Sequence, residues 1–295
     1  MNSVFVPALG KHISQAGLGC VTFGREIDRA ASFSIMDHAL EQGVTFFDTA
    51  SAYGGGASET IVGQWFAEKG EAAAHIAIAS KLVPPFDAST LAAAVEQSLT
   101  RLRMERIDVL FVHSFHPSIE DERVLSALNA LVVAGKVGAL GVSNFNAAQL
   151  GSVLRKQVEG GLAPMSFVQN NQNYAVSHVD EALRQLCRDF GVHIVTYSPL
   201  AAGFLTGKYR GAVASDVRFE IMPGHKDIYF NDRAWARLDQ LMKAAEQAGK
   251  PVANLALAWA FHQEQVSSVL IGCRTTSHLD QALAALAEGD PGLPA

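Results

Sequence analysis

The sequence predicts an α/β fold whose parallel strands close into a (β/α)8 TIM barrel. Apolar, β-branched runs of strand length occur eight times along the 295 residues, and segments with helical spacing of apolar residues separate them. Such alternation, with near-continuous apolar strands, is typical of a parallel sheet. Eight units over about 250 residues match the size of a closed barrel. An open, doubly wound sheet is the alternative architecture. We expect a single domain over residues 1–295.

The expected elements follow in chain order. A hairpin comes first, with strands at residues 4–6 and 11–14 and a turn at Leu9-Gly10. The eight barrel strands are expected at residues 16–20, 44–47, 76–81, 108–113, 137–142, 167–169, 193–197 and 268–272. Periodicity predicts helices over residues 29–42, 89–101, 122–134, 179–190 and 234–248, with an extra helix at 251–262 before the last strand.

Polar residues mark the expected helix starts, and one long connection has little periodicity. We expect Ser58 to open the second helix, Asp87 or Ser89 to cap the third, Asn146 the fifth and Ser177 the sixth. Residues 201–231, after the seventh strand, are expected to form a long loop. A loop of that length in a compact domain is usually functional.

Composition limits the class of partner. The chain is 49% hydrophobic and 18% charged, with a net charge of -6 and a pI near 5.9, so we expect neither nucleic acid nor an anionic membrane as a partner. The N-terminus lacks the pattern of a signal peptide, and no apolar run has the length of a membrane span. Cys20, Cys187 and Cys273 are far apart in sequence, which fits a reducing cytoplasm.

One stretch combines a strand end with polar side chains and glycines. The apolar run at residues 44–47 ends in Asp48, and Tyr53 follows beside the glycines at 54–56. Glycines let a backbone turn sharply and approach a ligand closely. A buried strand, then an acid, then a phenol on a tight loop is how a barrel enzyme places reacting groups at strand ends. An ordinary turn after a strand is the alternative interpretation.

Two further polar residues end the next expected strands. Lys81 ends the third and His113 ends the fourth, so a barrel would bring them to the same rim as Asp48 and Tyr53. A lysine that ends an apolar strand needs a charged partner, and Asp48 on the adjacent strand is the obvious one. Taken singly, Asp48 and Lys81 fit a plain buried ion pair, and His113 fits a hydrogen-bonded core histidine. Together they favour a catalytic site.

The four residues suggest general acid catalysis. A free tyrosine has a pKa near 10 and donates a proton poorly at neutral pH, whereas a nearby ammonium lowers that pKa. Asp48 would hold Lys81 charged beside Tyr53, and a neutral His113 would orient a carbonyl substrate. Tyr53 would then protonate an alkoxide as it forms. Because no side chain can supply hydride, this chemistry requires a nicotinamide cofactor.

The sequence resembles the aldo-keto reductases from residue 16 to about residue 286. Residues 47–50 with Tyr53-Gly54 look like the catalytic turn of that family, and Lys81 and His113 stand where its other catalytic residues are expected. Further strings typical of the family are Gly135-Lys136-Val137, Gly141-Val142-Ser143-Asn144-Phe145, Val168-Gln169-Asn170, Tyr197-Ser198-Pro199-Leu200 and Leu205-Thr206-Gly207-Lys208-Tyr209.

The resemblance implies contacts to NADPH or NADP+. Ser143, Asn144 and Gln169 would bind the nicotinamide carboxamide, and Tyr197 would stack on its ring. The segment at residues 200–208 would lie along the pyrophosphate. The cofactor contacts implied between the seventh strand and the end of that segment are Ser198, Leu200, Leu205, Gly207 and Lys208.

The family's cofactor-phosphate segment follows the eighth strand, and here it departs from the usual pattern. Relatives usually have Arg or Gln at His278 and a Glu-Asn pair at Gln281-Ala282. Gly272, Arg274, Thr275 and His278 are the expected contacts in this segment, with Arg274 and Thr275 as candidates for the 2′-phosphate. The sequence favours NADP(H), with NAD(H) as the alternative. Phe23, Phe86 and Phe115 are expected to wall an apolar substrate pocket, although Phe86 fits ordinary packing equally well.

The expected function is NADP(H)-dependent reduction of an aldehyde or ketone by a cytoplasmic monomer or weak homo-oligomer. One alternative is a metal-dependent barrel hydrolase that uses His113, His116 and Asp48, although no metal is part of the favoured interpretation. Another is a non-enzymatic subunit that binds NADPH as a sensor. The sequence does not name the carbonyl substrate, because specificity lies in variable loops.

Overall fold

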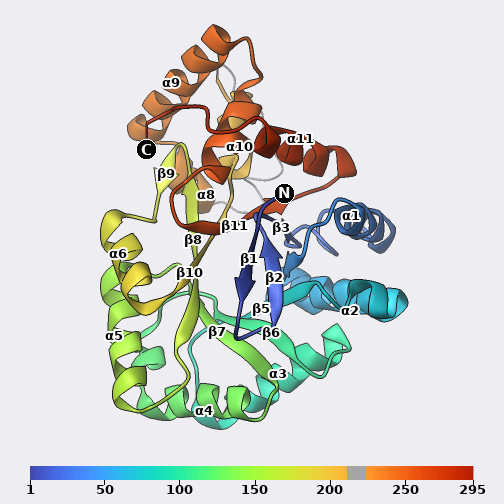
Figure 1. The fold of residues 1–295 in the computed structure, drawn as a ribbon, viewed down its shortest axis with the longest axis vertical. Helices are drawn as coiled ribbons and strands as arrows, with labels where there is room; N and C mark the ends of the chain where they lie inside the picture. Colours follow the sequence, from blue (N-terminus) through green and yellow to red (C-terminus); the bar gives the residue numbers. More distant parts are fainter. Residues whose placement is uncertain (211–223, 295) are drawn as a thin grey trace.

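Eight parallel strands form a closed barrel surrounded by helices in the computed structural model, which describes residues 1–210 and 224–294 (Figure 1). The strands pair in sequence from β3 to β8, and β10 and β11 complete the ring. Closure is shown at the last strands, because β10 pairs with both β8 and β11, and β11 pairs with β3. The predicted TIM barrel is therefore confirmed over the open sheet.

The barrel strands fall where the apolar runs predict them, with one marked exception. Their bounds are β3 Ala16–Gly19, β4 Phe46–Asp48, β5 Ala77–Leu82, β6 Ile107–Val112, β7 Val137–Ser143, β8 Met165–Asn173, β10 His193–Tyr197 and β11 Val266–Gly272. The exception is β8, which is three times as long as the expected 167–169 because it continues through a run of polar amides. A two-residue strand, β9 (Val176–Ser177), folds back on its end.

The helices cover the outside of the barrel. The α-helices are α1 Arg29–Glu41, α2 Ala57–Lys69, α3 Ala88–Leu102, α4 Glu122–Val133, α5 Ala147–Glu159, α6 Glu181–Phe190, α8 Gly224–Tyr229, α9 Asp232–Ala248, α10 Val252–Phe261 and α11 Thr276–Ala287. The short 3-10 helices are η1 Tyr53–Gly56, η2 Gly70–Ala73, η3 Pro117–Glu120 and η4 Ala201–Thr206. The predicted extra helix before the last strand is confirmed as α10.

The expected helix caps are partly confirmed. Asp87 caps α3 through the Ser89 N–H, and Asn146 forms a full capping box on α5 with Gln149. The prediction for Ser177 is wrong, because the Asp180 side chain caps α6. Ser58 lies one residue inside α2, where its buried hydroxyl donates to the Cys20 carbonyl at 2.8 Å instead of capping the helix.

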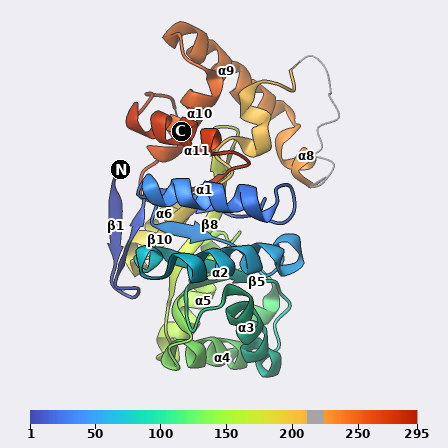
Figure 2. The ribbon, with the colours of Figure 1, turned by 90° about the vertical axis from the view of Figure 1, so that its right-hand side faces the viewer.

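The N-terminal hairpin closes one end of the barrel. Strands β1 (Ser3–Val6) and β2 (Lys11–Ser14) pair antiparallel, as predicted, and lie beside the barrel in Figure 2. Ile13 of the hairpin packs in the same buried cluster as the inward-facing Phe111 and Phe167. The Lys11 ammonium is bonded to Asp108 at 2.9 Å near the start of β6. A ligand must therefore enter at the opposite end, where the strands finish.

The connection after β10 contains more structure than the sequence predicts. Its first part is η4, which begins shortly after β10, and its last part is α8, which leads into α9. Residues 211–223 lie outside the described part of the chain. Among residues 1–210 and 224–294, no helix combines the length and apolar character needed to cross a bilayer.

Candidate active site

The carboxyl ends of three adjacent strands bring the predicted catalytic residues together. Asp48 is the last residue of β4, Lys81 lies in β5, and His113 directly follows β6. Tyr53 begins η1, the turn that leads from β4 to α2. Gly54 and Gly55 in this turn have φ values of 58° and 62°. Residues with a Cβ rarely adopt this conformation, so the glycines allow the tight turn by which the chain passes from Tyr53 into α2.

Lys81 is the centre of the group. Its side chain is fully buried and donates to the Asp48 carboxylate, to the Thr49 carbonyl at 2.9 Å and to the Tyr53 hydroxyl at 3.2 Å. These three contacts use the three hydrogen-bond donors of an ammonium group. The nearby carboxylate and phenol raise the pKa of Lys81 above its ordinary value, even though burial opposes this. Lys81 is therefore a cation at neutral pH.

Tyr53 differs from the sequence prediction in the direction of its pKa. Burial raises the pKa of Tyr53, the Lys81 ammonium lowers it, and the net effect is an increase above the ordinary value. The expectation that Lys81 would make this phenol more acidic than a free tyrosine is therefore wrong for the chain alone. The physical reason is that burial removes the hydration that stabilises a phenolate. The Lys81 ammonium, which Tyr53 shares with Asp48, replaces only part of that stabilisation. Tyr53 stays protonated at neutral pH, which is the form a proton donor needs.

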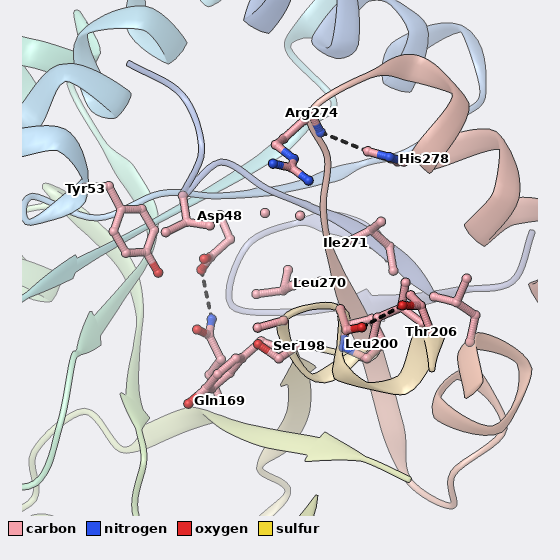
Figure 3. Close-up of a pocket in the computed structure, with 18 of the residues that line it drawn as sticks. Asp48, Tyr53, Gln169, Ser198, Leu200, Thr206, Leu270, Ile271, Arg274 and His278 are labelled. Carbon is pink, nitrogen blue, oxygen red and sulfur yellow. Dashed lines mark hydrogen bonds between the residues drawn. The ribbon is translucent and has the colours of Figure 1, made fainter. Parts of the chain in front are cut away.

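Asp48 has two partners that fix its carboxylate. One oxygen accepts from Lys81, and the other accepts from the Gln169 side-chain amide at 2.8 Å (Figure 3). Burial raises the pKa of Asp48, and the contacts with Lys81 and Gln169 oppose this rise. Asp48 of β4 is thus bonded to Lys81 of β5 and to Gln169 of β8. The buried ion pair considered from sequence is present, and it contacts the Tyr53 hydroxyl.

His113 completes the group as a neutral base. Its ring meets the Tyr53 ring edge to face, with centroids 5.7 Å apart. Burial, together with the Lys81 charge, lowers the pKa of His113 from 6.5 to about 4. Its Nδ1 is buried and has no hydrogen-bond partner among the described residues. Because Nδ1 is buried, Nε2 is the ring nitrogen that can contact a group in the cavity that His113 lines.

These residues line one wall of a cavity of about 400 Å³ at the carboxyl end of the barrel. In Figure 3, Tyr53 and Asp48 lie on one side, and Arg274 and His278 lie on the other side above Leu270 and Ile271. Predicted site residues that line the cavity are Asp48, Tyr53, His113, Ser143, Asn144, Gln169, Tyr197, Ser198, Leu200, Lys208, Gly272, Arg274 and His278. Lys81 lies below this surface, behind Asp48 and Tyr53.

A chain of hydrogen bonds joins the loops after β7 and β10. The Tyr197 hydroxyl donates to the Asn144 side-chain oxygen at 2.6 Å, and the Asn144 amide donates to the His113 carbonyl at 3.1 Å. The Ser143 hydroxyl donates to the Gln169 carbonyl at 2.9 Å. Asn144 itself has a φ of 62°, a conformation that asparagine tolerates better than most residues. These hydrogen bonds hold Tyr197 and Asn144 at fixed positions on the cavity wall.

Two cationic residues contribute to the cavity lining. Lys208, just after η4, and Arg274, just after β11, both line it. The Arg274 backbone N–H donates to His278 Nδ1 at 3.3 Å, which ties the loop to the first turn of α11 (Figure 3). Arg274 lies on the side of the cavity away from Tyr53 in Figure 3, and Lys208 adds a second positive charge to the lining, so these residues could bind an anionic group.

Three predicted cofactor contacts and the three phenylalanines do not line this cavity. Leu205 is fully buried, Gly207 ends η4 with a φ of 79°, and the Thr275 hydroxyl is bonded to Ser277 at 2.9 Å. Phe23 is likewise fully buried in the core, so it packs the fold and does not wall the cavity. Phe86 and Phe115 pack against the same core cluster. The Phe115 ring meets the Phe145 ring edge to face, with centroids 5.3 Å apart.

The expected segment at residues 200–208 supplies Ala202, Gly203 and Thr206 to the lining. Sequence reasoning gave no role to the lining residues Gly19, Val21, Pro199, Leu257, Leu270, Ile271 and Gln281, and all of these except Gln281 are small or apolar. Gly19 and Ile271 belong to β3 and β11, so the rule that barrel strand ends line the site could have found them. Leu257 carries no such signal, because it lies in the middle of the apolar helix α10.

Two of the three side chains considered for a metal, Asp48 and His116, have other partners. Both carboxylate oxygens of Asp48 are bonded to protein groups, and His116 Nδ1 accepts from the Ser118 N–H at 3.1 Å. Within the described ranges, no three His, Cys, Asp or Glu side chains gather as a metal-binding group. The geometry of these residues therefore gives no support to a hydrolase metal centre.

Comparison with known proteins agrees with this site. The profile of the aldo/keto reductase family matches residues 16–289. Among similar proteins, oxidoreductase YrpG of Bacillus subtilis is 27% identical over 309 residues, covering 97% of this chain and 91% of the relative. A probable voltage-gated potassium channel subunit beta of Arabidopsis thaliana is 30% identical, covering 94% and 88%. Human aflatoxin B1 aldehyde reductase member 4 is also 30% identical, covering 92% and 88%. The chain therefore belongs to the aldo/keto reductase family of oxidoreductases.

Proposed function

We propose that this protein reduces an aldehyde or ketone to an alcohol with NADP(H), and that Tyr53 is the general acid. The observation that carries the proposal is the contact of the buried Lys81 ammonium with both Asp48 and the Tyr53 hydroxyl, the latter at 3.2 Å. This arrangement lies beside His113 at the wall of a cavity of about 400 Å³. The name of the human relative, an aldehyde reductase, supports the same class of substrate.

The residues at the cavity wall suit a nicotinamide dinucleotide. Asn144 and Gln169 are both amides, and a carboxamide offers the matching donor and acceptor groups. The Asn144 amide already donates to the His113 carbonyl and to Ser143, and its oxygen accepts from Tyr197. Asn144 would therefore act toward a carboxamide through the remaining lone pair of its oxygen, while the Tyr197 ring would stack on the nicotinamide. The bound cofactor supplies hydride to the carbonyl carbon.

The protein's own part in the reaction is to orient the carbonyl and to provide a proton. A neutral His113 would donate a hydrogen bond from Nε2 to the carbonyl oxygen. Tyr53 would then give its proton to that oxygen as negative charge develops on it, because an alkoxide is a far stronger base than a phenolate. Lys81 would stabilise the phenolate that remains, and Asp48 would hold Lys81 in place. Burial raises the pKa of Tyr53 in the free protein, so its hydroxyl stays protonated until negative charge develops on the carbonyl oxygen.

NADP(H) is preferred over NAD(H) because of charge at the far end of the cavity. Arg274 lines the cavity on the loop after β11, and an arginine fork suits a phosphate monoester. Lys208, which lines the cavity just after η4, would face the pyrophosphate. We propose a single domain over residues 1–295 and a monomer or weak homo-oligomer that works in the cytoplasm on a small carbonyl compound.

A second candidate is a subunit that binds the cofactor without turning substrate over. The similarity to a plant protein named as a probable potassium channel subunit beta favours this candidate. The complete group of Asp48, Tyr53, Lys81 and His113 favours catalysis, because a cofactor sensor has no use for a proton donor at the hydride site.

Cofactor titration followed by an activity screen tests the proposal. Quenching of tryptophan fluorescence by NADPH and by NADH gives the two dissociation constants, and the proposal predicts tighter NADPH binding. NADPH consumption is then followed over a panel of aldehydes and ketones. Binding without consumption of NADPH by any carbonyl compound would favour the sensor subunit. If neither cofactor binds, both candidates fail.

A further inference from the structure

A row of five buried amides continues β8 past the rim of the barrel. Residues 169–173 are all Gln or Asn, and each is between 1% and 3% exposed. Burying an amide is unfavourable unless its donors and acceptors are bonded. Only the first of these amides, Gln169, contacts the catalytic group directly, through Asp48. The amides near the end of β8 therefore need another explanation.

Asn173 has its full hydrogen-bonding capacity in use, and one partner belongs to the cavity wall. Its amide donates to the Ser198 carbonyl and to the Asn171 oxygen, each at 3.0 Å. Its oxygen accepts from the N–H groups of Ala175 and Val176, each at 3.1 Å. Ser198 has a φ of 57°, and a non-glycine residue keeps such a conformation only where its surroundings hold it. Asn173 thus fixes the start of the wall segment at residues 198–206.

Asn171 extends the same network to the end of that segment. Its amide donates to the Tyr229 hydroxyl at 2.9 Å, and both residues are buried. The Tyr229 ring of α8 stacks on the Phe204 ring of η4, with centroids 6.2 Å apart and planes 20° from parallel. Phe204 is fully buried and directly follows the cavity-lining residue Gly203 in the sequence. One network therefore supports the wall segment at both ends.

We propose that Asn173, Asn171 and Tyr229 are positioning residues that preform the cofactor-binding wall at residues 198–206. The inference rests on the proposed function, because it assigns the network to the cofactor side of that site. None of the three residues lines the cavity and all three are buried, so we expect them to act on a bound cofactor only through the wall. A wall held in its binding conformation avoids the entropic cost of ordering when the ligand arrives. The network should therefore affect cofactor affinity and leave the chemical step unchanged.

Two variants of different severity test the network. Tyr229→Phe removes one hydroxyl and keeps the ring on Phe204, whereas Asn173→Ala removes four hydrogen bonds. Asn129→Ala is the matched control, because its side-chain oxygen accepts from the Ala163 N–H at 2.9 Å at the opposite end of the barrel. For each protein, the NADPH dissociation constant, kcat at saturating NADPH, the carbonyl KM and the Tm without cofactor are measured.

The proposal predicts that Tyr229→Phe weakens NADPH binding about fivefold and Asn173→Ala about tenfold or more. It also predicts an unchanged kcat and carbonyl KM, since only uniform binding of the cofactor is lost. Asn129→Ala should lower Tm without changing NADPH affinity. If the two network variants lower Tm but bind NADPH like the wild type, the role is merely structural and the proposal is overturned.

Tyr229→Phe alone decides the outcome if Asn173→Ala does not fold, because it deletes a single oxygen atom. The wild-type titration separates this inference from the proposed function. Wild-type protein that binds no NADPH contradicts the proposed function. Wild-type binding with unaltered affinity in Tyr229→Phe contradicts only the network.

Discussion

The Lys81 ammonium donates to the Tyr53 hydroxyl across 3.2 Å, although 28 residues separate them in the sequence. The barrel makes this contact possible, because Lys81 lies in β5 and Tyr53 lies in the turn after the neighbouring strand β4. The pair gives Tyr53 a cation that stabilises its phenolate, while burial keeps its proton in place at rest.

Lys81→Met should destabilise the protein and slow catalysis. The substitution leaves the Asp48 carboxylate buried without its cation, and breaking one side of a buried ion pair costs about 3–5 kcal/mol of unfolding free energy. Loss of the charge beside Tyr53 should lower kcat by about two orders of magnitude. Urea unfolding and steady-state kinetics measure the two effects.

Lys69→Met is the matched control for this variant. Lys69 forms an ion pair with Asp37 at 2.6 Å, but its side chain is 33% exposed and that of Asp37 is 42% exposed. An exposed pair contributes at most about 1 kcal/mol. Equal losses of stability in the two variants would contradict the assignment of Lys81 as a buried, structurally required cation.

Stability should fall on acidification because His113 is buried as a neutral base. Burial lowers its pKa to about 4 in the folded protein, against 6.5 for an ordinary histidine. Below pH 6.5 the unfolded chain binds a proton that folded His113 does not, so stability is full above that pH and is lost as pH falls toward 4. Between pH 7 and pH 5 the loss should be about 2 kcal/mol.

Urea unfolding of the wild type and His113→Gln at both pH values isolates this contribution. The wild type should lose about 2 kcal/mol more than the variant over that interval. An identical pH dependence in both proteins would mean that His113 titrates normally in the folded state.

Arg274→Ala should remove the preference for NADP(H). If Arg274 binds the 2′-phosphate, its loss should weaken NADPH binding by about 10- to 100-fold, which is the range for a hydrogen bond to a charged group. NADH lacks that phosphate, so its affinity should stay the same. Fluorescence titration with both cofactors gives the ratio, and Arg123→Ala, which removes an exposed arginine paired with Asp121 at 2.6 Å, serves as the control. Equal loss for NADPH and NADH would assign Arg274 to a different part of the cofactor.

The barrel could be predicted from the sequence because its signal is local. Seven of the expected strands are close to their observed positions, since each is a short apolar run between helical segments. The strand β8 is the exception, because the polar residues Asn171 and Asn173 are typical of a loop. They are buried in a strand because they bond to Tyr229 and Ser198. Those partners come from other parts of the chain, and a sequence pattern does not reveal them.

The candidate site was predictable to the extent that it follows from strand ends. Asp48, Lys81 and His113 lie at or next to the carboxyl ends of successive strands, so the barrel alone brings them together. The direction of the Tyr53 pKa was not predictable, because it depends on a balance between burial and the Lys81 charge. The place of Phe23 was likewise unpredictable, because the aromatic character that suits a substrate pocket also suits the core.

The most direct test is the turnover of Tyr53→Phe with a carbonyl compound that the wild type reduces. The substitution removes only the hydroxyl that Lys81 contacts, so the cavity and its cofactor contacts should remain. We predict that NADPH still quenches the fluorescence with wild-type affinity while kcat falls by about 100- to 10,000-fold, the range for a lost general acid. Carbonyl reduction at the wild-type rate by Tyr53→Phe would contradict the account, because the proton would then come from another group.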